Sequence, residues 1–267
     1  PVIAAGINLF NGAMGLLNRH VTGAIPIRRD SRDPAYLATL RAYVAELVQR
    51  HDLFLYLEGG RSYSGEFKSL KTGLLQAVVQ ARRPDAVIVP VAIAYDLVLE
   101  DQALARQGMK RRQRRFTGEV AEMVRFAVGY ESRAFVTFGQ PIPLETVDPD
   151  SRRDLVTLTR HTREAIGKLY KVLPTALLAA ALRPSMPRQN LVDRIDELLD
   201  ALRSVNANLG VESGYQAVEQ ATGPLVARGV IVVEGERYRV RERHVLRYYA
   251  RSLTHLLKAR AGSNKTS

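Results

Sequence analysis

The order of the apolar segments limits this chain to a small set of folds. Residues 53–57 (Leu-Phe-Leu-Tyr-Leu) and 86–94 (Ala-Val-Ile-Val-Pro-Val-Ala-Ile-Ala) are apolar runs typical of buried strands. Helical patterns alternate with them, over residues 34–50, where an Asp-Pro pair marks the start, and over residues 72–81. This order predicts an α/β fold with a mostly parallel sheet flanked by helices.

The pattern becomes mainly helical from about residue 151. Apolar spacing predicts helices over residues 151–172, 175–182, 189–203 and 244–258. Before the last helix, two short strands flank a Glu-Gly turn, as in the hairpin of a winged helix. We therefore predict an α/β domain over residues 1–172 and a helical C-terminal region over residues 173–267, with residues 183–187 as a joint between subdomains.

Composition restricts the classes of partner. The chain has 267 residues, a formal net charge of +12 and a sequence pI near 10.2. So positive a surface favours nucleic acid, anionic lipid headgroups or phosphorylated substrates, and composition leaves all three open. The absence of cysteine excludes disulfides and thiolate chemistry, and five scattered histidines without HExxH spacing predict no metal site. No apolar run approaches the roughly 18 residues of a membrane-spanning helix.

A glycine-rich segment directly follows the first apolar run. Residues 57–73 read LEGGRSYSGEFKSLKTG, and such a loop after a parallel strand presents backbone N–H groups where ligands of α/β folds bind. Arg61 can fork onto phosphate oxygens, while Ser62 and Lys71 add further donors. Glu58 can accept a hydrogen bond from a substrate hydroxyl. The segment, which lacks the Walker pattern, is interpreted as a cradle for a phosphorylated polyol, with a solvated surface loop as the alternative.

Two further cations end a strand-like segment nearer the N-terminus. Arg28 and Arg29 follow residues 23–27, and paired arginines at such a position ordinarily face water. They contribute to a site only if they lie close to the glycine-rich loop. We predict that they meet Arg61 and Lys71 at one edge of the sheet and bind a phosphate together with them.

Several motifs, in order along the chain, resemble sequence blocks of the glycerol-3-phosphate acyltransferases, of the membrane-associated type that includes dihydroxyacetone-phosphate acyltransferases. Residues 58–62, with Gly65 and Lys71-Thr-Gly, resemble the third block, residues 23–29 the second and residues 89–96 the fourth. Matches at residues 138–142 and 246–256 extend the resemblance over nearly the whole chain. The chain departs from the family at Tyr63, where a cation is common, and just before Lys71, where proline is common.

The resemblance implies an enzyme of phospholipid synthesis. It would move a fatty acyl group from acyl-CoA or acyl carrier protein to the sn-1 hydroxyl of glycerol 3-phosphate, giving lysophosphatidic acid, with no metal or bound cofactor. The residues implied to bind the phosphoglycerol are Arg28 or Arg29, Glu58, Gly60, Arg61, Ser62 and Lys71. Pro90 is implied to line the acyl-donor side, and Tyr95 is interpreted as a donor contact or as a packed core tyrosine. Acyl-chain length, the donor, dihydroxyacetone phosphate as an alternative acceptor and oligomeric state stay open.

The family's first block, His-x4-Asp, does not occur in the 267 residues. In the family its histidine acts as general base and its aspartate orients the ring. None of the histidines, at positions 20, 51, 161, 244 and 255, has an aspartate five residues further on. We therefore expect no catalytic residue in this chain and a general base upstream of Pro1, so that the chain is a fragment. A natural, catalytically inactive family member is the alternative.

A basic run and the C-terminal hairpin suggest two kinds of macromolecular partner. The run consists of Lys110, Arg111, Arg112, Arg114 and Arg115. We predict that it contacts an anionic membrane surface, with the protein peripheral on the cytoplasmic face of the cell membrane; a solvated loop is the alternative. The winged-helix-like tail leaves open a rival function, nucleic-acid binding, and the spread of cations along the whole chain argues against it.

Overall fold

The computed structural model describes residues 1–10, 15, 20–28, 31–60, 62–98, 101, 104–105 and 132–263. The chain forms two compact units, each described here by itself. Unit 1 comprises Pro1–Arg61, Lys68–Pro90 and Gln140–Glu164. Unit 2 comprises Ser62–Phe67, Val91–Gly139 and Ala165–Ser267. The predicted domain boundary at residues 172/173 stays a prediction.

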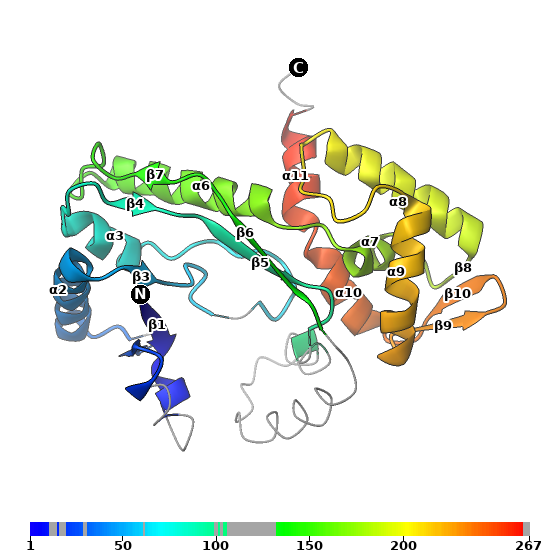
Figure 1. Cartoon of the computed structure of the whole chain (residues 1–267), viewed down its shortest axis with the longest axis horizontal. Helices are drawn as coiled ribbons and strands as arrows, with labels where there is room; N and C mark the ends of the chain where they lie inside the picture. Colours follow the sequence, from blue (N-terminus) through cyan, green and yellow to red (C-terminus); the bar gives the residue numbers. More distant parts are fainter. Residues whose placement is uncertain are drawn as a thin grey trace. The chain divides into compact units, whose positions relative to one another are not determined.

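Unit 1 is built on a parallel three-stranded sheet in the order β2-β1-β3; Figure 1 labels β1 and β3 of this sheet. The strands are β1 (Val2–Gly6), β2 (Ala24–Ile27) and β3 (Leu53–Phe54). Helix α2 (Pro34–Arg50) begins where predicted, because the Asp33 side chain accepts from the Ala35 N–H at 3.0 Å. It packs with α3 (Gly73–Gln80) around the buried Val44 and Ala77. The α/β class is confirmed, whereas the central strand β1 was not foreseen.

The remaining parts of unit 1 lie further along the chain. A short 3-10 helix, η1 (Ile7–Phe10), follows β1. Strand β4 (Val87–Ile88) pairs antiparallel with β7 (Ile142–Pro143). Helix α6 (Arg152–Leu169) belongs to this unit as far as Glu164.

Residues 86–94 differ from their prediction as one strand of a parallel sheet. They form two strands separated at Val89 and Pro90, and the second, β5 (Val91–Tyr95), pairs antiparallel with β6 (Ala134–Phe138). Pro90 has no N–H for a sheet ladder, so it ends β4 and stands before β5. Burial in β5 alternates, which is typical of a sheet covered on one face.

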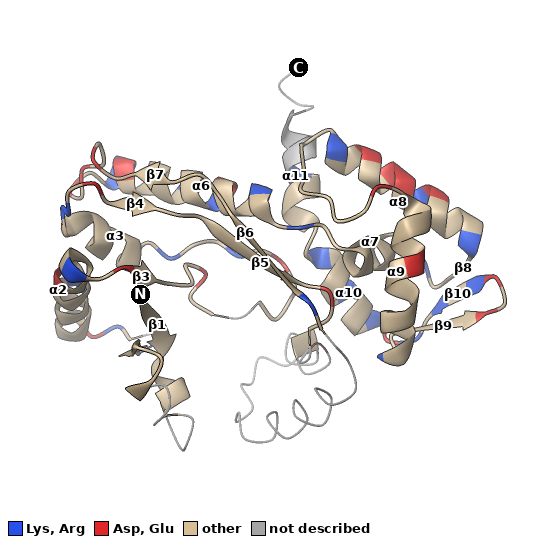
Figure 2. Cartoon of the chain, viewed as in Figure 1, with Lys and Arg blue, Asp and Glu red and all other residues tan. Residues whose placement is uncertain are grey.

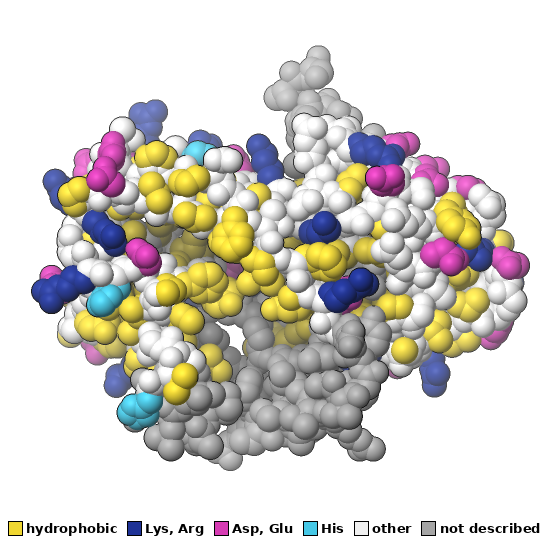
Figure 3. All heavy atoms as spheres, viewed as in Figure 1, with side chains coloured by type: hydrophobic (Ala, Val, Ile, Leu, Met, Phe, Trp, Pro, Cys, Tyr) yellow, Lys and Arg dark blue, Asp and Glu magenta, His cyan; other side chains and the backbone are white. Residues whose placement is uncertain are grey.

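The two faces of the β5–β6 pair have different environments. Ala92 and Ala94 are buried on one face. The other, here called the outer β5–β6 face, carries only apolar side chains: Val91, Ile93, Tyr95, Ala134, Val136 and Phe138. Val136 is 50% and Phe138 68% exposed, and Figure 3 shows hydrophobic side chains gathered over this region. A pair of strands with this face uncovered exposes a contiguous apolar patch.

Unit 2 has a winged-helix arrangement around one large core. It contains α7 (Pro174–Ala181), β8 (Ser185–Pro187), α8 (Arg188–Arg203), α9 (Gly214–Ala227), β9 (Ile231–Glu234) and β10 (Arg237–Val240). The three strands pair antiparallel in the order β8-β10-β9. The predicted hairpin is confirmed, but residues 183–187 contain the third strand of this sheet and are not merely a joint.

The last helix is two helices, α10 (Arg243–Arg251) and α11 (Thr254–Ser263). The Ser252 hydroxyl donates to the Tyr249 carbonyl at 2.7 Å, and the Ser252 N–H donates to the same oxygen at 3.1 Å. These bonds to residue i−3 tighten the turn and replace the helical i−4 pattern. No helix in the described part of the chain is both long enough and apolar enough to cross a membrane.

Candidate functional site

The glycine-rich segment closes on itself in unit 1. The Lys71 N–H donates to the Leu57 carbonyl at 2.8 Å, which brings the two ends of the loop together. Gly59 has φ +69°, and a Cβ there would lie 2.7 Å from Lys71 Cδ. The Lys71 side chain therefore lies across Gly59, directly beside Glu58 in the sequence. A glycine is required at this position because the backbone is left-handed and the lysine approaches so closely.

Glu58 lies among cations, two of which the sequence analysis did not identify. Its Oε2 accepts from the Lys68 N–H at 2.9 Å, and Arg163 Nε donates to the Lys68 carbonyl at 3.3 Å. Burial raises the pKa of the Glu58 carboxyl above 4.5, while the Lys68 N–H bond and the charges of Lys68 and Arg163 act to lower it. Burial outweighs them. Arg163 belongs to α6, far away in sequence, so no local pattern could have associated it with Glu58.

The raised pKa of Glu58 predicts a cost in stability above about pH 4.5. As pH rises through 4.5, the unfolded chain releases the Glu58 proton first, so the free energy of unfolding falls until the folded pKa is passed. In Glu58→Gln the amide oxygen still accepts from Lys68 but cannot ionise. We expect this variant to gain stability relative to wild type between pH 4 and pH 7 in urea unfolding.

Glu46→Gln is the matched control for that measurement. The Glu46 side chain is 66% exposed on α2 and pairs with Arg50. A surface pair of this kind contributes little, about 0–1 kcal/mol. If both glutamine variants showed the same pH profile as wild type, burial of Glu58 would not be costly and the interpretation would be wrong.

The middle of the loop, residues 62–67, packs within unit 2 against the C-terminal helices. Gly65 has φ +82°, and a Cβ there would lie 1.9 Å from the Tyr248 carbonyl oxygen. Glu66 pairs with Arg251 at 3.8 Å, and the Phe67 ring meets His255 edge-on at 5.4 Å. Helices α10 and α11 thus support this part of the loop. The Ser62 hydroxyl donates to the Glu66 carbonyl at 2.7 Å, so it also stabilises the loop from within.

Only some of the residues predicted to form a shared phosphate site lie in the described part of the chain. Arg28 lies over the Tyr36 ring, with its guanidinium carbon 5.4 Å from the ring centroid, and its N–H donates to the Tyr36 hydroxyl at 2.8 Å. Gly60 is half-buried in the loop. Arg29 and Arg61 lie outside the described residues, so a shared phosphate site stays a prediction.

The residues assigned to the acyl donor and to the membrane have different outcomes. Pro90 is buried at the end of unit 1. Tyr95 is 48% exposed at the end of β5, so its interpretation as a packed core tyrosine was wrong. Its contact with an acyl donor stays a prediction. The basic run, from Lys110 to Arg115, lies outside the described residues, and its role at a membrane stays a prediction.

The helix that precedes the wing gives no support to nucleic-acid binding. In winged-helix proteins that bind DNA, this helix enters the major groove and needs cations for the phosphates. Its counterpart α9 contains no lysine or arginine, as Figure 2 shows, and its sequence includes Glu219. The neighbouring Arg188 pairs with Glu219 and lies over the Tyr215 ring at 5.1 Å. Helix α9 therefore lacks the positive charge that a DNA-reading helix requires.

Comparisons with known proteins agree with the resemblance found in the sequence. Residues 1–94 match the family model described as Acyltransferase. The "Putative acyltransferase plsB1" of Mycobacterium tuberculosis (strain ATCC 25618 / H37Rv) is 32% identical over 194 residues, covering 66% of this chain and 31% of that protein. The "Glycerol-3-phosphate acyltransferase" of Actinobacillus succinogenes is 28% identical over 297 residues, covering 96% of this chain and 36% of that protein. The chain thus spans about a third of the length of these relatives.

Proposed function

We propose that this chain takes part in acylating glycerol 3-phosphate, because residues 1–94 match the Acyltransferase family model and the chain is similar over 96% of its length to a glycerol-3-phosphate acyltransferase. The acyl donor is acyl-CoA or acyl carrier protein, and the acceptor is the sn-1 hydroxyl. The hydroxyl oxygen forms the ester bond to the acyl carbon, the carbon–sulfur bond breaks, and the thiol leaves with the hydroxyl proton. The product is lysophosphatidic acid.

The observation that carries the proposal is the pairing of a carboxylate with cations at the closed end of the loop. Lys71 lies across Gly59, next to Glu58 in the sequence; the Lys68 N–H donates to the Glu58 carboxylate, and the charges of Lys68 and Arg163 act on it. A glycerol phosphate offers one group for each charge: its phosphate suits the cations, and its hydroxyls can donate to the Glu58 carboxylate. A ligand with a phosphate alone would leave Glu58 facing another anion.

The residues of this loop do not include a general base that could remove the proton from the acceptor hydroxyl. No histidine of the chain belongs to a His-x4-Asp motif. We propose that the general base comes from protein outside these 267 residues and that this chain binds the acceptor. An inactive family member would still bind the acceptor but would not turn it over. Binding and turnover are therefore measured separately.

Peripheral attachment to an anionic membrane surface is part of the same proposal. The product is a lipid, and the net charge of +12 favours anionic headgroups. The cationic run that ends at Arg115 is the segment that we assign to this contact.

Lys71→Gln tests the binding step. In the full protein we expect KM for glycerol 3-phosphate to rise roughly tenfold or more, because a charge-assisted bond to the phosphate is lost. In the chain alone, the increase in melting temperature caused by glycerol 3-phosphate should shrink by a corresponding amount. Lys168→Gln, an exposed lysine of α6, is the matched control and should behave as wild type. Equal effects of both substitutions, or none, would rule out this phosphate site.

A further inference from the structure

A cavity in unit 2 contains none of the glycine-rich loop residues. Its volume is about 220 Å³. Its polar lining consists of Asp96, Arg133, Lys171, Thr175 and Gln220. Apolar side chains from β6, from residues 173–174 and from α9 complete the walls. The cavity thus combines two cations and an amide with a carbon-lined interior.

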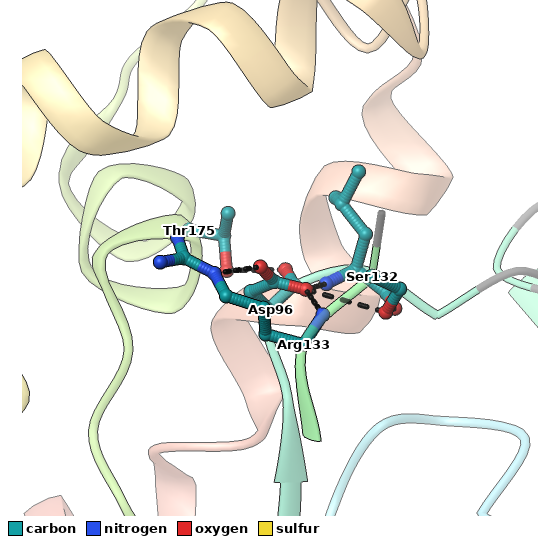
Figure 4. A network of polar contacts seen from close by, with 5 residues as sticks. Asp96, Ser132, Arg133 and Thr175 are labelled. Carbon is teal, nitrogen blue, oxygen red and sulfur yellow. Dashed lines mark hydrogen bonds and ion pairs between the residues drawn. The ribbon is translucent and has the colours of Figure 1, made fainter. Parts of the chain in front are cut away.

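Asp96, one of the lining residues, is held by a network of hydrogen bonds (Figure 4). Its side chain is 9% exposed, and its Oδ1 accepts from the Leu97 and Arg133 N–H groups at 2.7 and 2.8 Å and from the Ser132 hydroxyl at 3.3 Å. The Thr175 hydroxyl donates to the Asp96 carbonyl at 2.8 Å. So many donors satisfy the carboxylate that it offers little negative charge to a ligand.

Arg133 is anchored at one nitrogen and open at the others. Its Nε donates to Asp96 Oδ2 at 3.2 Å, while the side chain as a whole is 70% exposed. Within the described part of the chain, neither terminal nitrogen of Arg133 makes a hydrogen bond or an ion pair. The guanidinium therefore presents a fixed fork of donors, which loses little freedom when a ligand binds.

Lys171 supplies the second charge from another element. Its ammonium lies 5.5 Å from the centroid of the Phe135 ring, a cation–π contact that leaves its charge in place. Among the described lining residues, Asp96 is the only acidic one. These described residues, with two cations and one carboxylate, carry a net charge of +1.

We propose that this cavity binds the phosphate group of a small phosphate monoester. Arg133 contacts it with its two terminal nitrogens, Lys171 supplies a second positive charge, and the carbon skeleton lies against the apolar walls. Pockets for drug-sized ligands measure about 300–1,000 Å³. A cavity of about 220 Å³ therefore takes a molecule of the size of glycerol phosphate or the phosphorylated end of a longer one, such as phosphopantetheine.

Two pairs of probes test the assignment by NMR titration of the isotope-labelled chain. One pair is glycerol 3-phosphate and glycerol, the other 4'-phosphopantetheine and pantetheine. We expect the Gly210 amide, in the cavity lining, to shift with at least one phosphorylated probe and with neither phosphate-free one. Whichever phosphorylated probe binds identifies the source of the phosphate. Acetate at the same concentration is the control for a general anion effect.

Two substitutions decide whether the cations are responsible. Lys171→Gln leaves the Asp96–Arg133 contact intact, and we expect it to weaken binding roughly tenfold, with Arg133→Gln acting in the same direction. Arg237→Gln, on the exposed face of β10, is the matched control and should leave binding unchanged. The proposal is overturned if acetate or the phosphate-free probes shift Gly210 equally, if no probe shifts it, or if Lys171→Gln binds like wild type.

The glycine-rich loop is read out separately in the same spectra. The Gly59 amide lies beside Lys71 and reports on that loop. Lys71→Gln should abolish shifts at Gly59 and leave those at Gly210 unchanged. The titration can therefore exclude a phosphate site in the cavity without affecting the proposed function. It can equally exclude phosphate binding at the glycine-rich loop without affecting the cavity.

Discussion

Gly65→Ala is expected to destabilise the glycine-rich loop and to abolish or sharply reduce activity in the full protein. Gly65 has φ +82°, and a Cβ would come within 1.9 Å of the Tyr248 carbonyl oxygen, where no atom fits. Left-handed backbone alone costs a non-glycine residue about 1–3 kcal/mol. The clash adds to this cost and forces residues 62–67 away from α10. Thermal unfolding of the chain and turnover by the full protein measure the two effects.

Gly235→Ala separates the clash from the backbone strain. Gly235 has φ +59° in the wing hairpin, and a Cβ there would meet nothing within 4 Å. This variant should show only the backbone cost and keep full activity. If both variants lost the same stability, the contact between Gly65 and Tyr248 would contribute nothing, and the proposed support of the loop by α10 would be wrong.

Asp101→Asn is expected to cost about 3–5 kcal/mol of unfolding free energy, the range for removing one partner of a buried ion pair. Asp101 is fully buried and pairs with Arg228, whose side chain is 9% exposed. The Tyr249 hydroxyl donates to Asp101 Oδ2 at 2.7 Å and accepts from the Val98 N–H at 3.1 Å. Burial and the nearby Asp101 carboxylate raise the Tyr249 pKa well above 10. Urea unfolding of the chain measures the loss.

A double substitution tests the origin of that cost. In Asp101→Asn combined with Arg228→Met, no charge stays buried without its partner, so the pair should lose less stability than the sum of the single variants. The exposed Asp200, which pairs with Arg203 on α8, provides the matched surface control. Asp200→Asn should cost no more than about 1 kcal/mol. A cost for Asp101→Asn as small as this would contradict the burial of the pair.

The sequence predicted those elements that local signals define. Asp33 marks the start of α2, and helical spacing located α3 and α8. It missed β1, because only Val2 and Ile3 of this strand are β-branched and the alanines and glycine that follow them are depleted in strands. It also predicted β4 and β5 as one strand, because the apolar run is continuous in sequence. Pro90 has no N–H to donate to a neighbouring strand, and this interrupts the run.

The sequence predicted those residues of the candidate site that belong to the glycine-rich loop itself. Glu58 and Lys71 are close in sequence, and the structure brings them together. Arg163 and the C-terminal residues that support the loop lie far from it in sequence, on helices whose approach depends on tertiary packing. The same holds for Asp96 and Arg133, since a hydrogen bond across 37 residues leaves no periodic pattern.

The outer β5–β6 face has a practical consequence for work on this chain. Six apolar side chains, with Phe138 among the most exposed, form a surface that water solvates poorly. We expect chains purified alone to associate through this surface as their concentration rises. Mild detergent and dilute samples are therefore the conditions under which titrations of this chain report on single molecules.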